Sequence, residues 1–347
     1  MRKLISLLLS IAMILSMSVM FMTVTASAAW DGAASEPYTG EGTEASPFKI
    51  ANAAQLKAFA DDVNTGKFAT DTDADGIFDT FTYIYAELTA DIDLGNNEWA
   101  PIGNADTIFY GTFDGKNHTV SSFKVVNINY AGFIGVTNGA VKNLTVEKAT
   151  ITLDGVQANS AAIIAAHGKS GGTLTVENCV AGEGSSISVS NAPSANTRAG
   201  GIVGNSTDPA VVNVSNCVNY ADIALANTTS NHSALGGIVG ALRNGSIKNC
   251  VNYGDITTST GTKQTYIGGI VGLTVPVVIE SDPTALCDIE NCITYGNVLG
   301  DGNRVGGIIG NVYDSSKVTA TFKNVFSLAE RIEFGGKGGL FTGAIAY

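Results

Sequence analysis

The sequence predicts an all-β protein whose chain coils into a parallel solenoid. Three observations support this prediction: a short glycine motif recurs along the chain, a second motif follows several of its copies, and β-branched residues dominate the segments between them. The 347 residues include 41 glycines but only 7 prolines, and 14% are charged. Because almost no segment has the periodicity of a crossover helix, coiling is the way to stack such short parallel strands.

The glycine motif marks the start of each repeat. Its copies are GGIVG at 200–204, 236–240 and 268–272, GGIIG at 306–310, GFIG at 132–135, AAIIA at 161–165 and GGLFTG at 338–343. Equivalent positions of successive copies lie 30 to 39 residues apart, which indicates fixed strands joined by loops of changing length. We expect these glycines to permit tight corners and positive φ angles.

An asparagine–cysteine motif forms the second half of the repeat. It occurs as NCV at 178–180, NCVNYADI at 216–223, NCVNYGDI at 249–256 and NCITYGNV at 291–298. We therefore expect three short strands in each repeat, corresponding to the GGIVG, GSIKNC and VNYGDI segments, with turns of Gly, Asn, Ser and Asp between them.

Equivalent residues of successive coils should stack on one another, because neighbouring strands lie about 4.8 Å apart. The expected ladders are aliphatic at Ile202, Ile238, Ile270 and Ile308, amide at Asn216, Asn249 and Asn291, and thiol at Cys179, Cys217, Cys250 and Cys292. Stacked residues have roughly parallel Cα–Cβ vectors, which favours small buried thiols over a disulfide or metal site. Cys287 lies outside this ladder, so a Cys287–Cys292 bridge stays open.

By the residues GFIG, GIVG, GIIG and GLFTG, joined to NCVNYGDI-like strands, the chain resembles the GLUG-motif repeat proteins of bacterial secreted and surface proteins. The resemblance covers roughly residues 131–347. It implies a right-handed parallel β-helix and an adhesin-like role.

Residues 29–130 differ from the repeats and are expected to form an N-terminal cap and the first coils. The apolar residues between Asn52 and Val63 recur at helical spacing and predict a short amphipathic helix: Ala53, Leu56, Phe59, Ala60 and Val63. An uncovered solenoid end exposes strand edges, so we expect this helix to lie across the first coil. The region also resembles the module that often precedes GLUG repeats, and Asp91 and Asp93 are interpreted as structural.

An acidic loop at 71–79, DTDADGIFD, is the strongest local indication of chemistry. Carboxylates at Asp71, Asp73, Asp75 and Asp79, with the Ile77 carbonyl, could surround a Ca²⁺ ion, and Gly76 would supply the sharp turn. Thr82 occupies the position where an EF-hand requires Glu, so a full EF-hand is not supported. The nine-residue form is similar to the calcium loops of thrombospondin type 3 repeats; a solvated acidic turn is the alternative.

The N-terminus predicts secretion. Arg2 and Lys3 precede a long apolar run that ends in Ala26, Ser27 and Ala28, so residues 1–28 are interpreted as a signal peptide, with a retained membrane anchor as the alternative. Removing the two basic residues from 19 leaves 17 against 31 acidic ones, a net charge of −14. Such a charge disfavours nucleic acid and anionic lipid as partners, and no membrane insertion is expected after cleavage.

No complete catalytic motif is present. The stretch GKSGG formally matches a nucleophile elbow at Ser170, but strand-like sequence follows where that motif requires a helix. The three histidines, His118, His167 and His232, are scattered without a zinc-protease spacing. The nearest pieces of a polygalacturonase pattern, Ala166-His167-Gly168 and Arg331-Ile332-Glu333, each depart from it.

We therefore expect a secreted, non-enzymatic β-helix, located outside the cell or on its surface, that binds a glycan or an extracellular protein. The alternatives are a β-helix polysaccharide lyase or glycoside hydrolase and a purely structural surface or stalk component. The expected C-terminal end carries no evident cap, so a partner or further repeats are expected to cover it.

Overall fold

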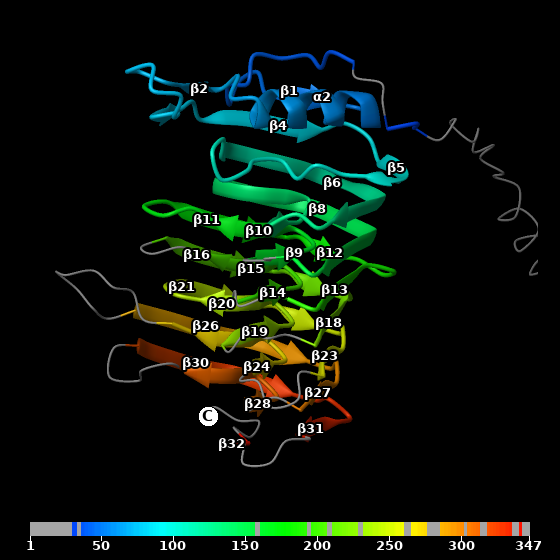
Figure 1. Cartoon of the computed structure of the whole chain (residues 1–347), viewed down its shortest axis with the longest axis vertical. Helices are drawn as coiled ribbons and strands as arrows, with labels where there is room; N and C mark the ends of the chain where they lie inside the picture. Colours follow the sequence, from blue (N-terminus) through cyan, green and yellow to red (C-terminus); the bar gives the residue numbers. More distant parts are fainter. Residues whose placement is uncertain are drawn as a thin grey trace, which may run out of the picture.

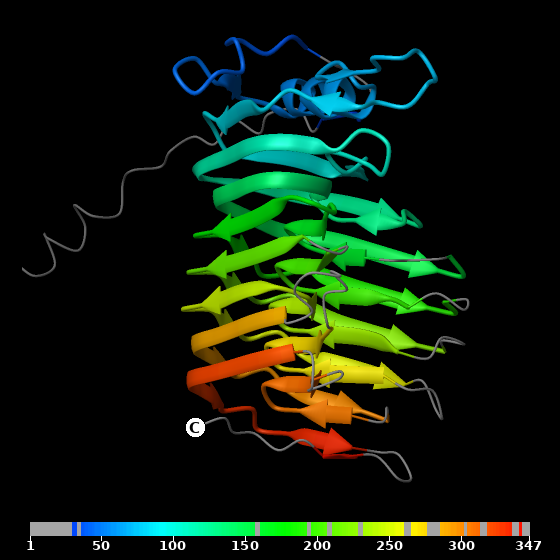
Figure 2. The ribbon, with the colours of Figure 1, turned by 90° about the vertical axis from the view of Figure 1, so that its left-hand side faces the viewer.

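The computed structural model describes residues 30–32, 36–156, 160–192, 196–206, 210–227, 232–259, 265–275, 285–301, 304–312, 318–334 and 340–341. These residues form a parallel β-solenoid of about 7 turns, with 59% strand and 1 helix. Figures 1 and 2 show the coils stacked along the long axis of the molecule, with the helix at the N-terminal end. The predicted all-β solenoid with a helix-containing cap is confirmed.

The first coils are built from the N-terminal strands. Their bounds are β1 Phe48–Ile50, β2 Ala69–Thr70, β3 Thr80–Phe81, β4 Ile84–Leu88, β5 Ile92–Glu98, β6 Phe109–Val126 and β8 Ile134–Asp154. Strands β1, β4, β6 and β8 pair in parallel, whereas β2 and β3 form a separate antiparallel hairpin.

The repeat coils then add strands in register below β8. One column contains β10 Ala165–Gly168, β15 Val203–Ser206, β20 Val239–Leu242, β25 Val271–Thr274 and β29 Ile309–Val312. The next contains β11 Thr173–Glu177, β16 Val211–Ser215, β21 Gly245–Lys248, β26 Ala285–Thr294 and β30 Val318–Ser327. Beyond them lie β12 Val180–Ala181, β17 Val218–Asn219 and β22 Val251–Asn252, followed by β13 Ser186–Ser190, β18 Asp222–Ala226, β23 Ile256–Ser259, β27 Val298–Gly300 and β31 Ile332–Phe334.

A separate seven-stranded sheet contains the short strands that lead into the glycine corners, one from each coil. Its strands are β7 Tyr130–Ala131, β9 Ser160–Ala162, β14 Arg198–Gly200, β19 Ser233–Gly236, β24 Thr265–Gly268, β28 Arg304–Gly306 and β32 Leu340–Phe341. The expected division into three strands per repeat is therefore too coarse. GGIVG is a corner between two strands, since β14 ends at Gly200 and β15 begins only at Val203.

The corner glycines are required by close packing and not by positive φ angles, which corrects the expectation from sequence. A Cβ atom on Gly236 would lie 2.1 Å from the Val239 carbonyl oxygen, and one on Gly237 would lie 2.2 Å from that of Gly269. Neither Gly236 nor Gly237 has a positive φ. The backbone layers approach so closely here that only a residue without a side chain fits.

Positive φ angles belong instead to the amide ladder. The asparagines at this corner have φ between +52° and +54° in six successive coils: Asn143, Asn178, Asn216, Asn249, Asn291 and Asn324. The Nδ2 of Asn249 donates to Oδ1 of Asn216 at 3.0 Å, and the Nδ2 of Asn291 donates to Oδ1 of Asn249 at 3.0 Å. Asparagine tolerates the left-handed region better than other side-chain-bearing residues, and its amide can bond both neighbours. The predicted amide ladder is confirmed and extends beyond the three predicted members.

The aliphatic and thiol ladders are also present. The backbone N–H of Ile202 donates to the carbonyl of Ile238, and the pattern repeats through Ile270 to Ile308. All five cysteines are buried and free. Cys287 and Cys292 lie on the same strand without a bridge between them, and burial raises the pKa of the Cys287 thiol to about 12. These thiols act as small core residues.

The N-terminal helix α2, Ala53–Asn64, caps the solenoid as predicted. Asn52 begins it by accepting a hydrogen bond from the N–H of Gln55 at 2.9 Å. The buried Phe59 ring packs against Phe109 at 6.0 Å and Phe113 at 6.2 Å between ring centres. Figure 1 shows the helix lying across the first coil. Its buried residues, which include Leu56, Phe59 and Val63, cover the otherwise open core.

The predicted signal peptide, residues 1–28, lies outside the described residues, as does most of the GGLFTG copy. Within the described part of the chain, no helix is both long and apolar enough to cross a membrane.

Candidate functional site

The acidic loop connects β2 and β3, and the structure brings three of its predicted ligands together. Carboxylate oxygens of Asp71, Asp73 and Asp79 lie within 4.8 Å of one another. Asp75 is outside this cluster and accepts a hydrogen bond from the N–H of Ile77 at 2.8 Å. The loop thus has three convergent carboxylates, fewer than the sequence suggested.

Hydrogen bonds within the loop hold these carboxylates in place. Asp71 accepts from the N–H groups of Ala74 at 2.8 Å and Gly76 at 2.9 Å. Asp79 accepts from the hydroxyl and, at 2.7 Å, from the N–H of Thr72, and these bonds lower the pKa of the Asp79 carboxyl. These hydrogen bonds therefore set the Asp71 and Asp79 carboxylates in one orientation.

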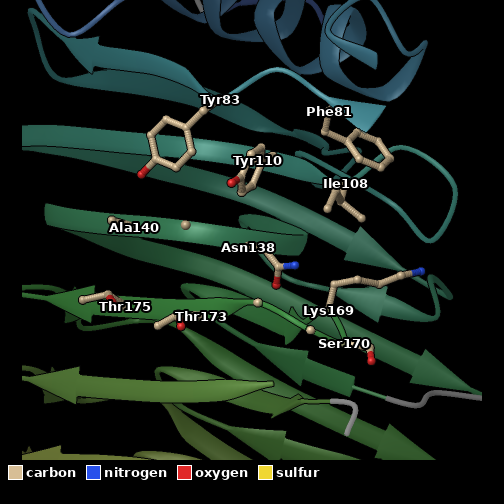
Figure 3. Close-up of a pocket in the computed structure, with 13 residues that line it drawn as sticks. Phe81, Tyr83, Ile108, Tyr110, Asn138, Ala140, Lys169, Ser170, Thr173 and Thr175 are labelled. Carbon is tan, nitrogen blue, oxygen red and sulfur yellow. The ribbon is translucent and has the colours of Figure 1, made fainter. Parts of the chain in front are cut away.

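A groove with a volume of about 700 Å³ lies beside the β2–β3 hairpin, on the outer face of β6, β8 and β11. Figure 3 shows its lining, which combines aromatic, hydroxyl and amide groups with one lysine. The labelled lining residues are Phe81, Tyr83, Ile108, Tyr110, Asn138, Ala140, Lys169, Ser170, Thr173 and Thr175.

Tyr83 and Tyr110 form the aromatic side of the groove. Their ring centres are 4.9 Å apart in an edge-to-face arrangement, and 37% and 38% of their surfaces remain exposed. The Tyr83 hydroxyl lies 2.9 Å from Oγ1 of Thr112, which fixes the ring. Tyr110 lies on β6 between buried neighbours, so the pleat directs it outward, and Tyr83 directly precedes the buried first residue of β4. Two large exposed rings are therefore pre-positioned side by side.

Asn138 and Lys169 provide polar groups opposite the rings. Asn138 pairs with Tyr110 across β6 and β8, is largely buried, and its Oδ1 has no hydrogen-bond partner. The Nζ of Lys169 donates to the carbonyl of Ala105 at 3.1 Å, which joins two loops at the groove. The Asn138 side chain thus lines the groove with a buried acceptor that has no hydrogen-bond partner.

The rejected catalytic motif also falls in this groove. Ser170 lies in a turn, and the chain after it continues into strand β11, not into a helix. The nearby His167 is buried, its Nδ1 has no hydrogen-bond partner, and burial lowers its pKa to about 4. His118 and His232 lie elsewhere, beside Asp91 and Tyr266 respectively. The three histidines do not converge. His118 bonds Asp91, the residue interpreted from the sequence as structural.

Sequence reasoning missed the aromatic groove. A signal was present in TFTYIYA at 80–86, where Phe81, Tyr83 and Tyr85 alternate with the core residues Ile84 and Ala86. Aromatic residues at successive outward positions of a strand indicate a surface that contacts something other than the core. The juxtaposition with Asn138 and Lys169 could not be seen, because it depends on stacking of three coils.

Comparisons with known proteins agree with the fold and leave the family open. No family model matches the chain. It is 31% identical over 184 residues to halomucin of Haloquadratum walsbyi, covering 49% of this chain and 2% of halomucin. It is 32% identical over 124 residues to a protein of Evansella cellulosilytica provisionally described as a Gly-rich membrane protein, covering 34% of this chain and 13% of that protein. The chain thus spans a small part of either relative.

A solved structure from Bacteroides ovatus, provisionally described as an immunoglobulin A1 protease, has a similar fold. Its TM-score is 0.58 with 22% sequence identity, over 89% of this chain and 81% of that chain. At this identity the likeness shows the shared solenoid fold alone.

Proposed function

We propose that the protein is a secreted binding module of the cell surface that holds a glycan in the groove beside Tyr83 and Tyr110. The observation that carries the proposal is this exposed, fixed pair of rings above a polar cavity of about 700 Å³. Ligand pockets typically have volumes of roughly 300–1,000 Å³ and combine aromatic walls with a few orienting polar groups.

A sugar ring matches the chemistry of this groove. It has apolar C–H faces that stack on aromatic rings, and hydroxyl groups around its edge that need hydrogen-bond partners. Tyr83 and Tyr110 supply the apolar surfaces. The amide of Asn138 and the hydroxyls of Thr173 and Thr175 supply partners for the sugar hydroxyls.

The location rests on the predicted signal peptide and on the relatives. One relative is described as a membrane protein, and residues 1–28 have the pattern of a secretion signal. The solenoid supplies a rigid scaffold with a long surface, as expected for a module that displays a site outside the cell.

A non-enzymatic role remains a prediction, with a β-helix lyase or glycosidase as the alternative. The residues that the structure describes around the groove include no Asp, Glu or His, the groups that most often transfer protons in glycan cleavage. Incubation with polygalacturonate and other glycans, followed by reducing-end and unsaturated-product assays, tests this directly. Robust turnover would overturn the non-enzymatic assignment.

We also propose that Ca²⁺ binds the loop at 71–79 as a structural ion. The convergence of the Asp71, Asp73 and Asp79 carboxylates within 4.8 Å supports this proposal. Oxygen ligands from a short turn suit this hard cation, and millimolar extracellular calcium would fill even a weak site. The Asp75 carboxylate and the Ile77 carbonyl are the remaining candidate ligands.

The glycan-binding proposal is tested with Tyr110→Ala on a glycan array, followed by calorimetry on the best glycan. Loss of one stacked ring should weaken binding by about 1–2 kcal/mol, or roughly 5- to 30-fold. Tyr253→Ala is the matched control, because Tyr253 is also an exposed tyrosine but stacks on Tyr220 and Tyr295 and does not line the groove. Equal losses in both variants, or binding only to matrix proteins, would refute the groove assignment.

A second variant alters the groove without removing an aromatic ring. A Cβ atom on Gly172 would lie 2.2 Å from Cγ of Asn138, so Gly172→Ala should displace that amide. Gly168→Ala is the control, because its added Cβ would meet neighbours only at ordinary contact distances of 3.5 Å or more. We expect weaker glycan binding in the first variant and unchanged binding in the second.

A further inference from the structure

The groove beside Tyr83 and Tyr110 is the first of three adjoining chambers, which share lining residues and are together called the cleft below. Phe81, Ile108 and Lys169 line both it and a second chamber of about 580 Å³. Asn64, Asn104, Ala105 and Asp106 line both the second chamber and a third, of about 420 Å³. Each chamber alone has the size of a small-ligand pocket, so three adjoining chambers offer more space than one or two sugar units require.

The far chamber repeats the chemistry of the first. Tyr130 lines it together with Ile128, Pro101 and the amides of Asn104 and Asn129. The Tyr130 ring packs on His167 with 4.8 Å between ring centres, which holds it in place. The cleft thus has aromatic residues at both ends and amide and hydroxyl groups between them.

Hydrogen bonds fix the lining of the middle chamber. The Asn64 side chain donates to the carbonyl of Pro101 at 3.0 Å and accepts from the N–H of Gly103 at 2.8 Å. Lys169 is tied to Ala105 on the facing loop. These bonds fix the C-terminal end of α2 and the loop at 100–108, so the cleft is preorganised for a ligand.

The charge of the cleft is balanced. Lys169 and Asp106 are the only charged side chains among the described residues that line the three chambers. The surroundings are acidic, since the loop at 71–79 borders the second chamber through Gly76 and Ile77. An anionic polymer would lack a cationic surface here and would be repelled by the acidic protein.

We propose that this cleft binds a neutral, linear polysaccharide over several consecutive sugar units, from Tyr83 and Tyr110 at one end to Tyr130 at the other. The inference rests on the proposed glycan-binding function and specifies its ligand class. Such a chain presents apolar ring faces and hydroxyl edges along its whole length, which matches the alternation of aromatic and polar lining.

The test measures how the affinity depends on the length of the oligosaccharide, with the full-length secreted protein in the cell of the calorimeter. The probes are oligosaccharide series from disaccharide to octasaccharide, prepared from xylan, mannan and β-glucan, with homogalacturonan as the anionic comparison, each titrated by calorimetry. For at least one neutral series, Kd should fall at least tenfold between disaccharide and hexasaccharide and then level off, while the anionic series binds more weakly. Length-independent Kd values, or tighter binding of galacturonate oligomers, would overturn the inference.

Variants separate the two ends of the cleft. Tyr130→Ala should weaken hexasaccharide binding about tenfold and leave disaccharide binding unchanged, whereas Tyr110→Ala weakens both. Ala105→Trp provides an independent check, because Ala105 is exposed at the junction of the second and third chambers and a large side chain there obstructs the cleft without entering the core. Its hexasaccharide affinity should drop to that of a shorter oligomer.

The two proposals fail in different ways. Disaccharide binding that depends on Tyr110, with no effect of Tyr130→Ala or Ala105→Trp on the hexasaccharide, refutes the extended cleft and preserves the first site. Absence of glycan binding by the wild-type chain refutes both.

Discussion

Replacing Asn249 removes one rung of the amide ladder and tests why asparagine occupies this corner. The wild-type side chain makes two amide bonds of 3.0 Å, to Asn216 and from Asn291, while its backbone has a φ of +54°. Asn249→Gly loses both bonds but keeps the backbone unstrained. Asn249→Ala loses the same bonds and must also hold a Cβ atom in the left-handed region.

The two variants should differ in their free energy of unfolding, because only alanine is strained by the left-handed backbone conformation. Each exposed amide bond contributes about 0.5–1 kcal/mol, so we expect Asn249→Gly to lower the free energy of unfolding by about 2 kcal/mol once the extra entropy of unfolded glycine is included. The left-handed conformation costs alanine about 1–2 kcal/mol, partly offset by its smaller entropy loss on folding. Asn249→Ala should therefore be less stable than Asn249→Gly by about 1 kcal/mol.

Urea unfolding followed by far-UV circular dichroism measures this difference, provided that the slope of the transition is unchanged among variants. Lys248→Ala is the neighbouring control: its ammonium is exposed and lies 4.0 Å from Glu290, so we expect a change within about 0.5 kcal/mol. If alanine at 249 is as stable as glycine, the explanation by left-handed backbone conformation is wrong.

Three further predictions concern protonation and metal binding. Burial, followed by nearby cations, lowers the pKa of His167 from 6.5 to about 4. The unfolded chain therefore takes up a proton first, and the free energy of unfolding should fall by up to about 3 kcal/mol between pH 6.5 and 4. His167→Gln should remove this slope, and the half-buried control His118→Gln should keep it. Burial raises the pKa of Cys287 from 9.0 to about 12, so the contribution of this thiol to stability is present below pH 9 and lost as the pH rises towards 12. Iodoacetamide should modify five thiols after denaturation and far fewer in the native protein at pH 8. Calorimetric titration of the wild-type chain with calcium should release or absorb heat that Asp73→Ala abolishes, and a wild-type titration without heat contradicts the calcium site.

The repeats made most of the fold predictable. Local alternation of core and surface residues, repeated with the same letters in successive coils, determines both that strands form and that they stack in register. For this reason the isoleucine, asparagine and cysteine ladders could be named from Ile202, Asn216 and Cys179 onward. The same reasoning was less successful at the corners, where it assigned positive φ angles to glycines such as Gly236 that instead allow two backbone layers to approach.

Less of the candidate site could be predicted from the sequence. The acidic loop is a contiguous stretch, so Asp71, Asp73 and Asp79 could be identified together, although only the folded turn shows that Asp75 lies outside their cluster. The groove combines Tyr110 with Lys169, which are far apart in the chain and have no shared motif.

The sequence by itself determined the solenoid, its cap and its ladders, because these follow from interactions between a residue and its equivalent in the next coil. Only the tertiary structure decided where a ligand could bind. The groove is lined by residues at the β2–β3 hairpin and at the turn following β10, which belong to different coils. These insertions do not repeat along the chain, so their lengths carry no periodic signal. Side chains at such insertions are positioned by distant contacts, so their proximity becomes visible only after the coils are stacked.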